Sequence, residues 1–200
     1  TADEIQLPAP YPCRDPEAAW QRVSTAIGEV KTDLKEMEEK VSREIGPEEA
    51  GIFKAHQSIV EDVALKDKVI DLLQQGVNPE AAWHEAVEGF ASMLANLSDP
   101  NLQARAVDVR DVGRQVLIRL LGHSEQKLTL TKPAVIGARD LTPAETAKLD
   151  KDLVVAFCTA EGGKTSHTAI LAKALGIPAV VGLGEEVVEI EDNTLVLVDG

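Results

Sequence analysis

The sequence predicts a two-part fold in which an all-α helical region precedes a small α/β domain. From Pro16 to about Leu121 the apolar residues recur every three or four positions, which is typical of amphipathic helices. After Gly122, short apolar runs rich in β-branched residues alternate with helical segments, which is typical of an α/β domain. The chain of 200 residues is long enough for both parts, and its 44% hydrophobic content is sufficient for a core.

The helical region begins with one long amphipathic helix that Gly46-Pro47 ends. Its narrow apolar seam consists of Trp20, Val23, Ile27, Val30, Leu34, Met37, Val41 and Ile45. A second helical region follows and ends before Gly76; its apolar positions are Ile52, Phe53, Ile59, Val60, Val69, Ile70, Leu72 and Leu73.

Two further helices complete this region. Asn78 is predicted as the N-cap of the third, with Pro79 at its first position. Asp99-Pro100 begins the fourth, and Gly122 ends it. Helices with such short connections are expected to pack as an antiparallel four-helix bundle.

In the second part we predict four buried strands, each bounded by turn-forming residues: residues 134–137, 153–157, 178–182 and 194–198. A capping box at Thr142-Pro143-Ala144-Glu145 opens one intervening helix. Another is predicted from Thr168 to Leu175, with Gly176 at its C-terminal cap.

Composition excludes several classes of function. The net charge of −14 has the wrong sign for a nucleic-acid partner, and favours either a basic protein partner or simply solubility. The sequence has no run of eighteen apolar residues, so we expect no membrane span, and the Thr1 end lacks the pattern of a signal peptide. Cys13 and Cys158 form no Cys-x-x-Cys pair, which favours the reducing cytoplasm.

The strongest candidate for chemistry is His167. It follows a predicted strand and a loop, and lies beside a helix N-terminus, where free N–H groups and the helix dipole stabilise a phosphoryl group. Imidazole is partly neutral near pH 7 and can act as a nucleophile. The neighbouring Gly162 and Gly163 allow close backbone approach, Lys164 adds positive charge, and Thr165 and Ser166 complete the loop.

This loop has three other interpretations. A nucleotide-binding P-loop requires glycine at position 158, where the chain has Cys158. A metal site is disfavoured because His56, His84, His123 and His167 all lack a partner at ligand spacing. His167 as an ordinary residue at a helix terminus is the weaker interpretation beside two glycines, Lys164, Thr165 and Ser166.

Residues 162–182 resemble the phosphohistidine signature that Enzyme I of the sugar phosphotransferase system shares with pyruvate phosphate dikinase and PEP synthase. Residues 51–56, 60–62 and 106–113 resemble the helical insert of Enzyme I, and residues 140–146 resemble its segment ahead of the active-site loop. The chain is therefore similar to the N-terminal domain of Enzyme I, alone or within a multiphosphoryl transfer protein.

This resemblance implies an α/β phosphohistidine swivelling domain, residues 1–15 and 123–200, with an inserted all-α four-helix HPr-binding subdomain, residues 16–122. It also implies that His167 carries phosphate on Nε2, hydrogen-bonded by Thr146, and exchanges it with the phosphocarrier protein HPr. The implied phosphate environment is Gly162, Gly163, Lys164, Thr165, Ser166 and Lys173, and the implied HPr surface includes Glu48, Glu49, His56, Asp62 and Arg105.

The sequence departs from the family in three places. Lys173 replaces the usual arginine, residues 1–15 do not resemble the expected first strand, and the chain ends at Gly200 without the PEP-binding barrel. We therefore expect a monomer without cofactor, with Mg²⁺ needed only by the C-terminal PEP-binding domain. This chain should accept phosphate from phospho-HPr but not from PEP. A dikinase swivelling domain and a docking module with an inactive histidine stay open as alternatives.

Overall fold

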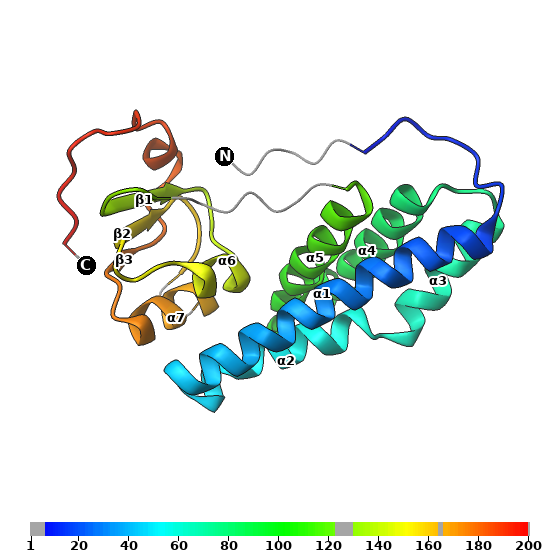
Figure 1. Ribbon diagram of the computed structural model, residues 1–200, viewed down its shortest axis with the longest axis horizontal. Coiled ribbons are helices and arrows are strands. Elements are labelled where there is room, and N and C mark those ends of the chain that lie inside the picture. Colours follow the sequence, from blue (N-terminus) through cyan, green and yellow to red (C-terminus); the bar gives the residue numbers. More distant parts are fainter. Residues whose placement is uncertain (1–6, 123–129, 164–165, 200) are drawn as a thin grey trace. The chain divides into compact units, whose positions relative to one another are not determined.

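The computed structural model describes residues 7–122, 130–163 and 166–199 of the chain. Helices occupy its first part and a small sheet with short helices its second, so the predicted two-part organisation is confirmed (Figure 1). The helices of the first part are α1 (Pro16–Glu44), α2 (Pro47–Val60), α3 (Val63–Gln74), α4 (Pro79–Ala95) and α5 (Pro100–Leu120).

Helix α1 buries the seam that its sequence predicts. Val23, Val30 and Leu34 are fully buried, whereas the charged Glu29 and Glu36 are exposed. These spacings place the three apolar side chains on one face of a helix with 3.6 residues per turn. The long α1 is therefore held by the burial of its apolar face.

Two helices, α2 and α3, occupy the stretch where the sequence analysis expected one helical region. The break falls at Asp62, whose side chain accepts the Leu65 N–H at 3.1 Å and so caps α3. The side-chain oxygen of an aspartate can accept nearby backbone N–H groups in place of the helix carbonyls. Aspartate is therefore favoured at a helix start over a helix interior. The described part of the chain thus has five helices before residue 122, and the expected count of four is corrected.

Helices α4 and α5 cross at very short range. Trp83 of α4 is buried, and its indole N–H donates to the carbonyl of Gly113 in α5 at 2.8 Å. A Cβ on Gly113 would lie 2.4 Å from Cγ1 of Val87, which is closer than two carbon atoms can approach. Glycine at this crossing is therefore required by the distance between the two helices.

Residues 7–15 form hydrogen bonds with the helical part. The Cys13 N–H donates to the Gly76 carbonyl at 2.8 Å. The Tyr11 hydroxyl donates to the carboxylate of Glu80, a residue that is 3% exposed, at 2.7 Å. These two hydrogen bonds hold the segment beside the end of α3 and the start of α4.

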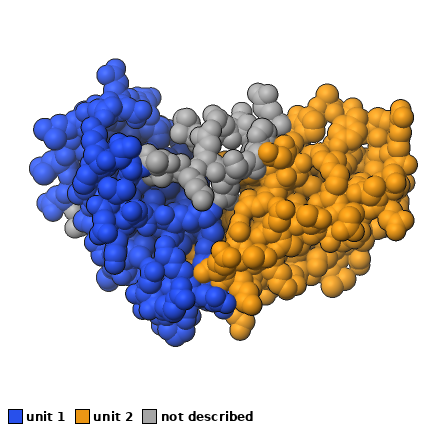
Figure 2. Space-filling model, viewed as in Figure 1, with its two compact units in different colours: residues 1–3, 37–52, 126–200 blue, residues 4–36, 53–125 orange. Residues whose placement is uncertain are grey.

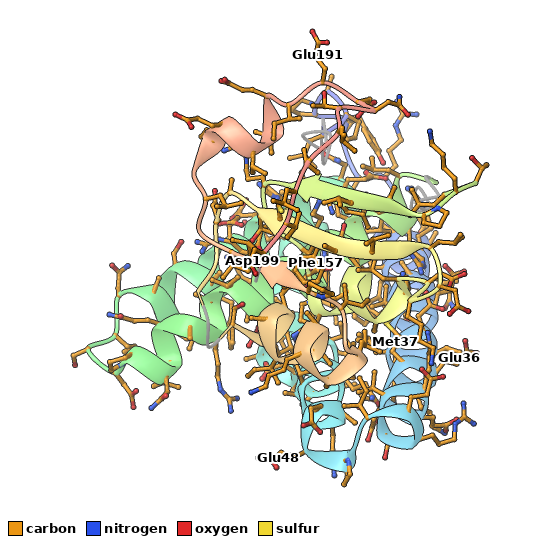
Figure 3. All side chains as sticks on the ribbon, turned by 90° about the vertical axis from the view of Figure 1, so that its left-hand side faces the viewer. Glu36, Met37, Glu48, Phe157, Glu191 and Asp199 are labelled. Carbon is orange, nitrogen blue, oxygen red and sulfur yellow. The ribbon has the colours of Figure 1, made fainter. Side chains whose placement is uncertain are left out.

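The second part contains a parallel sheet of three strands in the order β1 (Ala134–Ala138), β2 (Val154–Thr159) and β3 (Ala179–Val180). Between them run α6 (Pro143–Lys148) and α7 (His167–Leu175), and the 3-10 helix η1 (Glu185–Val188) follows β3. Phe157 of β2, labelled in Figure 3, is fully buried. It packs in one cluster with Ala172 of α7 and Ile177. The predicted strands 134–137, 153–157 and 178–182 are thus confirmed, the third at only two residues.

The fourth predicted strand, residues 194–198, is wrong for the described structure. These residues have no regular secondary structure, and Leu195 and Leu197 are 98% and 97% exposed. A strand needs a neighbour to satisfy its backbone N–H and C=O groups. Among the described residues none pairs with this segment, so its β-type composition produces no strand.

The chain divides into two compact units by the contacts of its residues (Figure 2). One unit contains residues 1–3, 37–52 and 126–200, and the other contains residues 4–36 and 53–125. The first unit thus contains the end of α1, the start of α2 and the α/β part. Within it, Lys40 donates to the Ala147 carbonyl at 2.9 Å. The predicted domain boundaries at residues 15 and 122 stay a prediction.

None of the helices in the described part is long and apolar enough to span a membrane.

Candidate functional site

The structure places His167 at the first position of α7, directly after the loop that leaves β2. Helix α7 begins one residue earlier than the sequence predicted, and Gly176 ends it in the left-handed conformation, as expected. The N–H groups of a first helical turn have no acceptor within the helix and carry partial positive charge. Such a helix start favours a nearby anion, and His167 occupies that position in α7.

Part of the predicted loop lies outside the described residues. This holds for Lys164 and Thr165 and for the side chain of His167. Ser166 is described, and its hydroxyl oxygen accepts the Ala169 N–H at 3.2 Å. Ser166 is thus the N-cap of α7, a role that the sequence analysis did not assign to it.

Residues 182–184 hold the start of this loop. The Leu183 N–H donates to the carbonyl of Thr159, the last residue of β2, at 3.0 Å. Gly182 and Gly162 approach so closely that a Cβ on Gly182 would lie 3.2 Å from the Gly162 carbonyl oxygen. Both glycines also have positive φ, +73° and +95°, which side chains rarely adopt. Gly182 is therefore required for the close approach of residues 182–184 to the start of this loop.

Thr146 lies on α6, which packs against α7. It is fully buried, and its hydroxyl donates to the Thr142 carbonyl at 2.9 Å. A hydroxyl has one proton, so the Thr146 oxygen is left to act as an acceptor toward any other group. Its predicted hydrogen bond with His167 stays a prediction.

Lys173, predicted in the phosphate environment, is exposed in the last turn of α7. It lies six residues after His167, which is about 9 Å along the helix axis. Its position favours interaction with the C-terminal carbonyls of α7. The predicted role of Lys173 beside the phosphate stays a prediction. It requires the Lys173 side chain to reach back along α7 toward His167.

Asp140 is a carboxylate beside the loop that the sequence analysis did not single out. Its Oδ1 lies 3.9 Å from the place that a Cβ on Gly162 would take. Partial burial raises the pKa of Asp140; the Leu141 N–H opposes this shift, and the charges of Glu161 and Glu145 add to it. Ionisation of Asp140 therefore costs more free energy in the folded protein than in the unfolded chain.

We expect Asp140→Asn to stabilise the protein slightly at pH 7, by less than about 1 kcal/mol because the group is partly exposed. Asparagine keeps the acceptor for the Leu141 N–H at 2.8 Å and removes the charge. A raised folded-state pKa means that the wild type loses stability as the pH rises from the ordinary aspartate pKa through the raised one. Thermal unfolding at pH 7 and pH 3 measures this, and an equal gain at both pH values would contradict the electrostatic cause.

The predicted docking residues do not share one environment. Glu48 is exposed in the first turn of α2 (Figure 3), and Arg105 is exposed on α5. Glu49 and Asp62 are half-buried, and Asp62 is occupied as the cap of α3. Their role in docking stays a prediction.

His56 is fully buried, and its predicted docking role, which rests on the resemblance alone, stays a prediction. The side chain has an apolar body and lies on α2 between the buried Phe53 and Val60, facing the interior. Its Nε2 lies 3.5 Å from Oδ1 of Asp108 on α5, a contact within the helical part.

The fold and the site together define a class of protein: a helical part joined to an α/β domain that presents a histidine at a helix N-terminus. The family models for the PEP-utilising enzyme, N-terminal, and for the PEP-utilising enzyme, mobile domain, match residues 3–105 and 130–200. The chain therefore belongs to the family of PEP-utilising enzymes.

Its relatives include a multiphosphoryl transfer protein of Xanthomonas campestris, 40% identical over 88% of this chain and 21% of the relative. A phosphoenolpyruvate-protein phosphotransferase of Mycoplasma capricolum is 36% identical over 90% of this chain and 32% of the relative. The chain thus spans about a fifth to a third of the length of these curated relatives.

A solution NMR structure of Enzyme I is similar to this chain, with a TM-score of 0.75 and 35% identity. The similarity covers 94% of this chain and 77% of that structure. The predicted resemblance to the N-terminal domain of Enzyme I is confirmed by this match and by the two family models.

Proposed function

We propose that this chain is the phosphoryl-carrying N-terminal part of a phosphoenolpyruvate-protein phosphotransferase of the Enzyme I type. The observation that carries the proposal is the position of His167 at the N-terminus of α7, within the segment that matches the mobile domain of the family. In this proposal His167 receives phosphate from PEP chemistry on another domain and passes it to HPr.

The proposed transfer exchanges one phosphorus–nitrogen bond for another. A lone pair on the His167 ring attacks the phosphorus of phospho-HPr, the bond to the donor histidine breaks, and the donor ring regains its lone pair. The reaction needs positioning and charge stabilisation rather than a cofactor. The positive end of the α7 dipole supplies part of that stabilisation.

Thr146 has a defined part in this scheme. Its hydroxyl proton is used on Thr142, so toward His167 its oxygen accepts a hydrogen bond from a protonated ring nitrogen. Neutral imidazole has one such nitrogen and one lone pair. Holding the N–H toward Thr146 leaves the other nitrogen free to attack phosphorus.

The remaining assignments follow from the proposed function. The partners are HPr and a C-terminal PEP-binding domain, and that domain is the one for which Mg²⁺ is expected. The protein works in the cytoplasm, and the 200-residue chain is a monomer. The exposed Glu48 and Arg105 and the half-buried Glu49 and Asp62 are offered as HPr contacts.

Phosphoryl transfer to the purified chain tests the proposal. We expect phospho-HPr to label the wild type with one phosphate on His167, and His167→Ala to stay unlabelled, a loss of at least about 10³-fold because the nucleophile is removed. Mass spectrometry with peptide mapping measures the label. His84→Ala is the matched control, since His84 is an exposed histidine on α4.

The outcomes separate the alternatives. No label on the wild type, or equal label on His167→Ala, would overturn the proposal. Label from ATP in place of phospho-HPr would indicate a dikinase swivelling domain. Label from PEP and Mg²⁺ without other proteins would contradict the expectation that PEP chemistry needs another domain.

A further inference from the structure

Thr168 follows His167 in the first turn of α7, and its hydroxyl is used in an unusual way. The residue is 5% exposed, and its Oγ1 donates to the carbonyl of Leu141, which is 27 residues earlier in the chain. Serine and threonine in a first helical turn commonly hydrogen-bond their own turn. Here the hydroxyl connects α7 to the segment between β1 and α6 instead.

The acceptor of this bond is itself held on both sides. The Leu141 N–H donates to Asp140 Oδ1 at 2.8 Å. Thr142 forms the capping box of α6, with its Oγ1 accepting the Glu145 N–H at 3.1 Å and its own N–H donating to the Glu145 carboxylate at 2.9 Å. The carbonyl of Leu141 is therefore an acceptor with a defined direction.

The same short segment also holds Thr146. The Thr142 carbonyl accepts the Thr146 hydroxyl, so the position of Thr146 depends on the N-cap of α6. The Thr168 bond joins the first turn of α7 to the residue that precedes this cap. The Thr168 bond thus fixes the start of α7, where His167 lies, relative to the segment that positions the Thr146 hydroxyl.

Both neighbours of His167 in the chain are anchored by their hydroxyl groups. Ser166 caps its own helix through Ala169, and Thr168 is bound to Leu141. The Ser166 bond sets where α7 begins, whereas the Thr168 bond sets the orientation of its first turn relative to α6.

We infer that Thr168 is a positioning residue for His167: it fixes the first turn of α7, which begins at His167, against the segment that holds Thr146. This inference rests on the proposed function, because Thr168 would act on phosphoryl transfer only through His167. Reactions that depend on near-attack geometry lose about 10²-fold for a displacement on the order of 1 Å.

The test compares Thr168→Val with Thr168→Ser. Valine keeps the shape and removes the hydroxyl, and serine keeps the hydroxyl. We expect Thr168→Val to lower the single-turnover rate of transfer from phospho-HPr by about 10- to 100-fold, with the half-saturating HPr concentration unchanged. Thr168→Ser should stay within about threefold of the wild type.

A second measurement does not depend on phosphoryl transfer. The ¹⁵N chemical shifts of the His167 ring report which nitrogen carries the proton, and we expect Thr168→Val to change this tautomer ratio and Thr168→Ser to retain it. If the wild type accepts no phosphate, the proposed function fails, but the ring shifts still decide the role of Thr168. Unchanged shifts and rate in Thr168→Val, or equal losses in Thr168→Ser, would overturn the inference.

Should Thr168→Val not fold, Thr168→Ala takes its place, because the smaller side chain leaves room for water at the Leu141 carbonyl. The same two measurements apply, with the same expected changes. A folded Thr168→Ala protein with wild-type ring shifts and transfer rate counts against a positioning role.

Discussion

Gly113→Ala is expected to destabilise the helical part by about 2 kcal/mol, because an alanine there overpacks the α4–α5 crossing. The added Cβ would lie 2.4 Å from Cγ1 and 2.9 Å from Cγ2 of Val87. Valine strongly prefers one χ1 rotamer in a helix, so turning Val87 aside is costly. Overpacking of this kind costs up to about 3 kcal/mol, and the better helix propensity of alanine returns about 1 kcal/mol.

Equilibrium unfolding in urea measures this loss, and the chain contains a matched control. Gly89 lies on α4, is exposed, and has no atom within 4 Å of an added Cβ. Gly89→Ala should therefore stabilise by about 0.5–1 kcal/mol through propensity alone. Adding Val87→Ala to Gly113→Ala should recover part of the loss, which a double-mutant cycle quantifies. Equal stabilisation in both alanine variants would refute the close crossing.

Glu80→Gln is expected to destabilise the helical part by about 2–3 kcal/mol at pH 7. The carboxylate is nearly buried and accepts side-chain hydrogen bonds from Tyr11 at 2.7 Å, Asn78 at 3.0 Å and Arg22 at 2.7 Å. A carboxylate offers only acceptors, whereas the glutamine amide would turn an NH₂ group toward one of these donors. In the wild type this carboxylate also holds Tyr11, which belongs to residues 7–15.

The pH dependence of this loss has a defined sign. Burial raises the pKa of Glu80, but the hydrogen bonds from Tyr11, Asn78, its own backbone N–H and Arg22 outweigh burial and lower it overall. A lowered folded-state pKa adds stability above the ordinary glutamate pKa, and this stability is lost as the pH falls through the folded value.

The difference in the free energy of unfolding between the wild type and Glu80→Gln should accordingly be largest at pH 7 and shrink below about pH 4. Denaturant unfolding at both pH values measures it. Glu85→Gln is the control on the same helix, because Glu85 is exposed, and it should change stability by less than about 0.5 kcal/mol. A loss for Glu80→Gln that persists unchanged at low pH would show that the charge is not its cause.

The sequence by itself predicted the features that depend on neighbouring residues. Apolar spacing predicted α1, capping chemistry predicted the starts of α4, α5 and α6, and the run of turn residues before Thr168 placed His167 at a helix N-terminus. Such patterns are read over one or two turns of chain, so no knowledge of distant residues is needed.

Only the tertiary structure decided the features that depend on which distant residues meet. It showed that residues 194–198 have no described partner strand, that His56 lies inside, and that Thr168 reaches Leu141. The same holds for Gly113 against Val87 and for Tyr11 on Glu80. The physical reason is that a strand, a buried polar group and a close helix crossing are stabilised by partners far away in the chain, and the local pattern does not contain them.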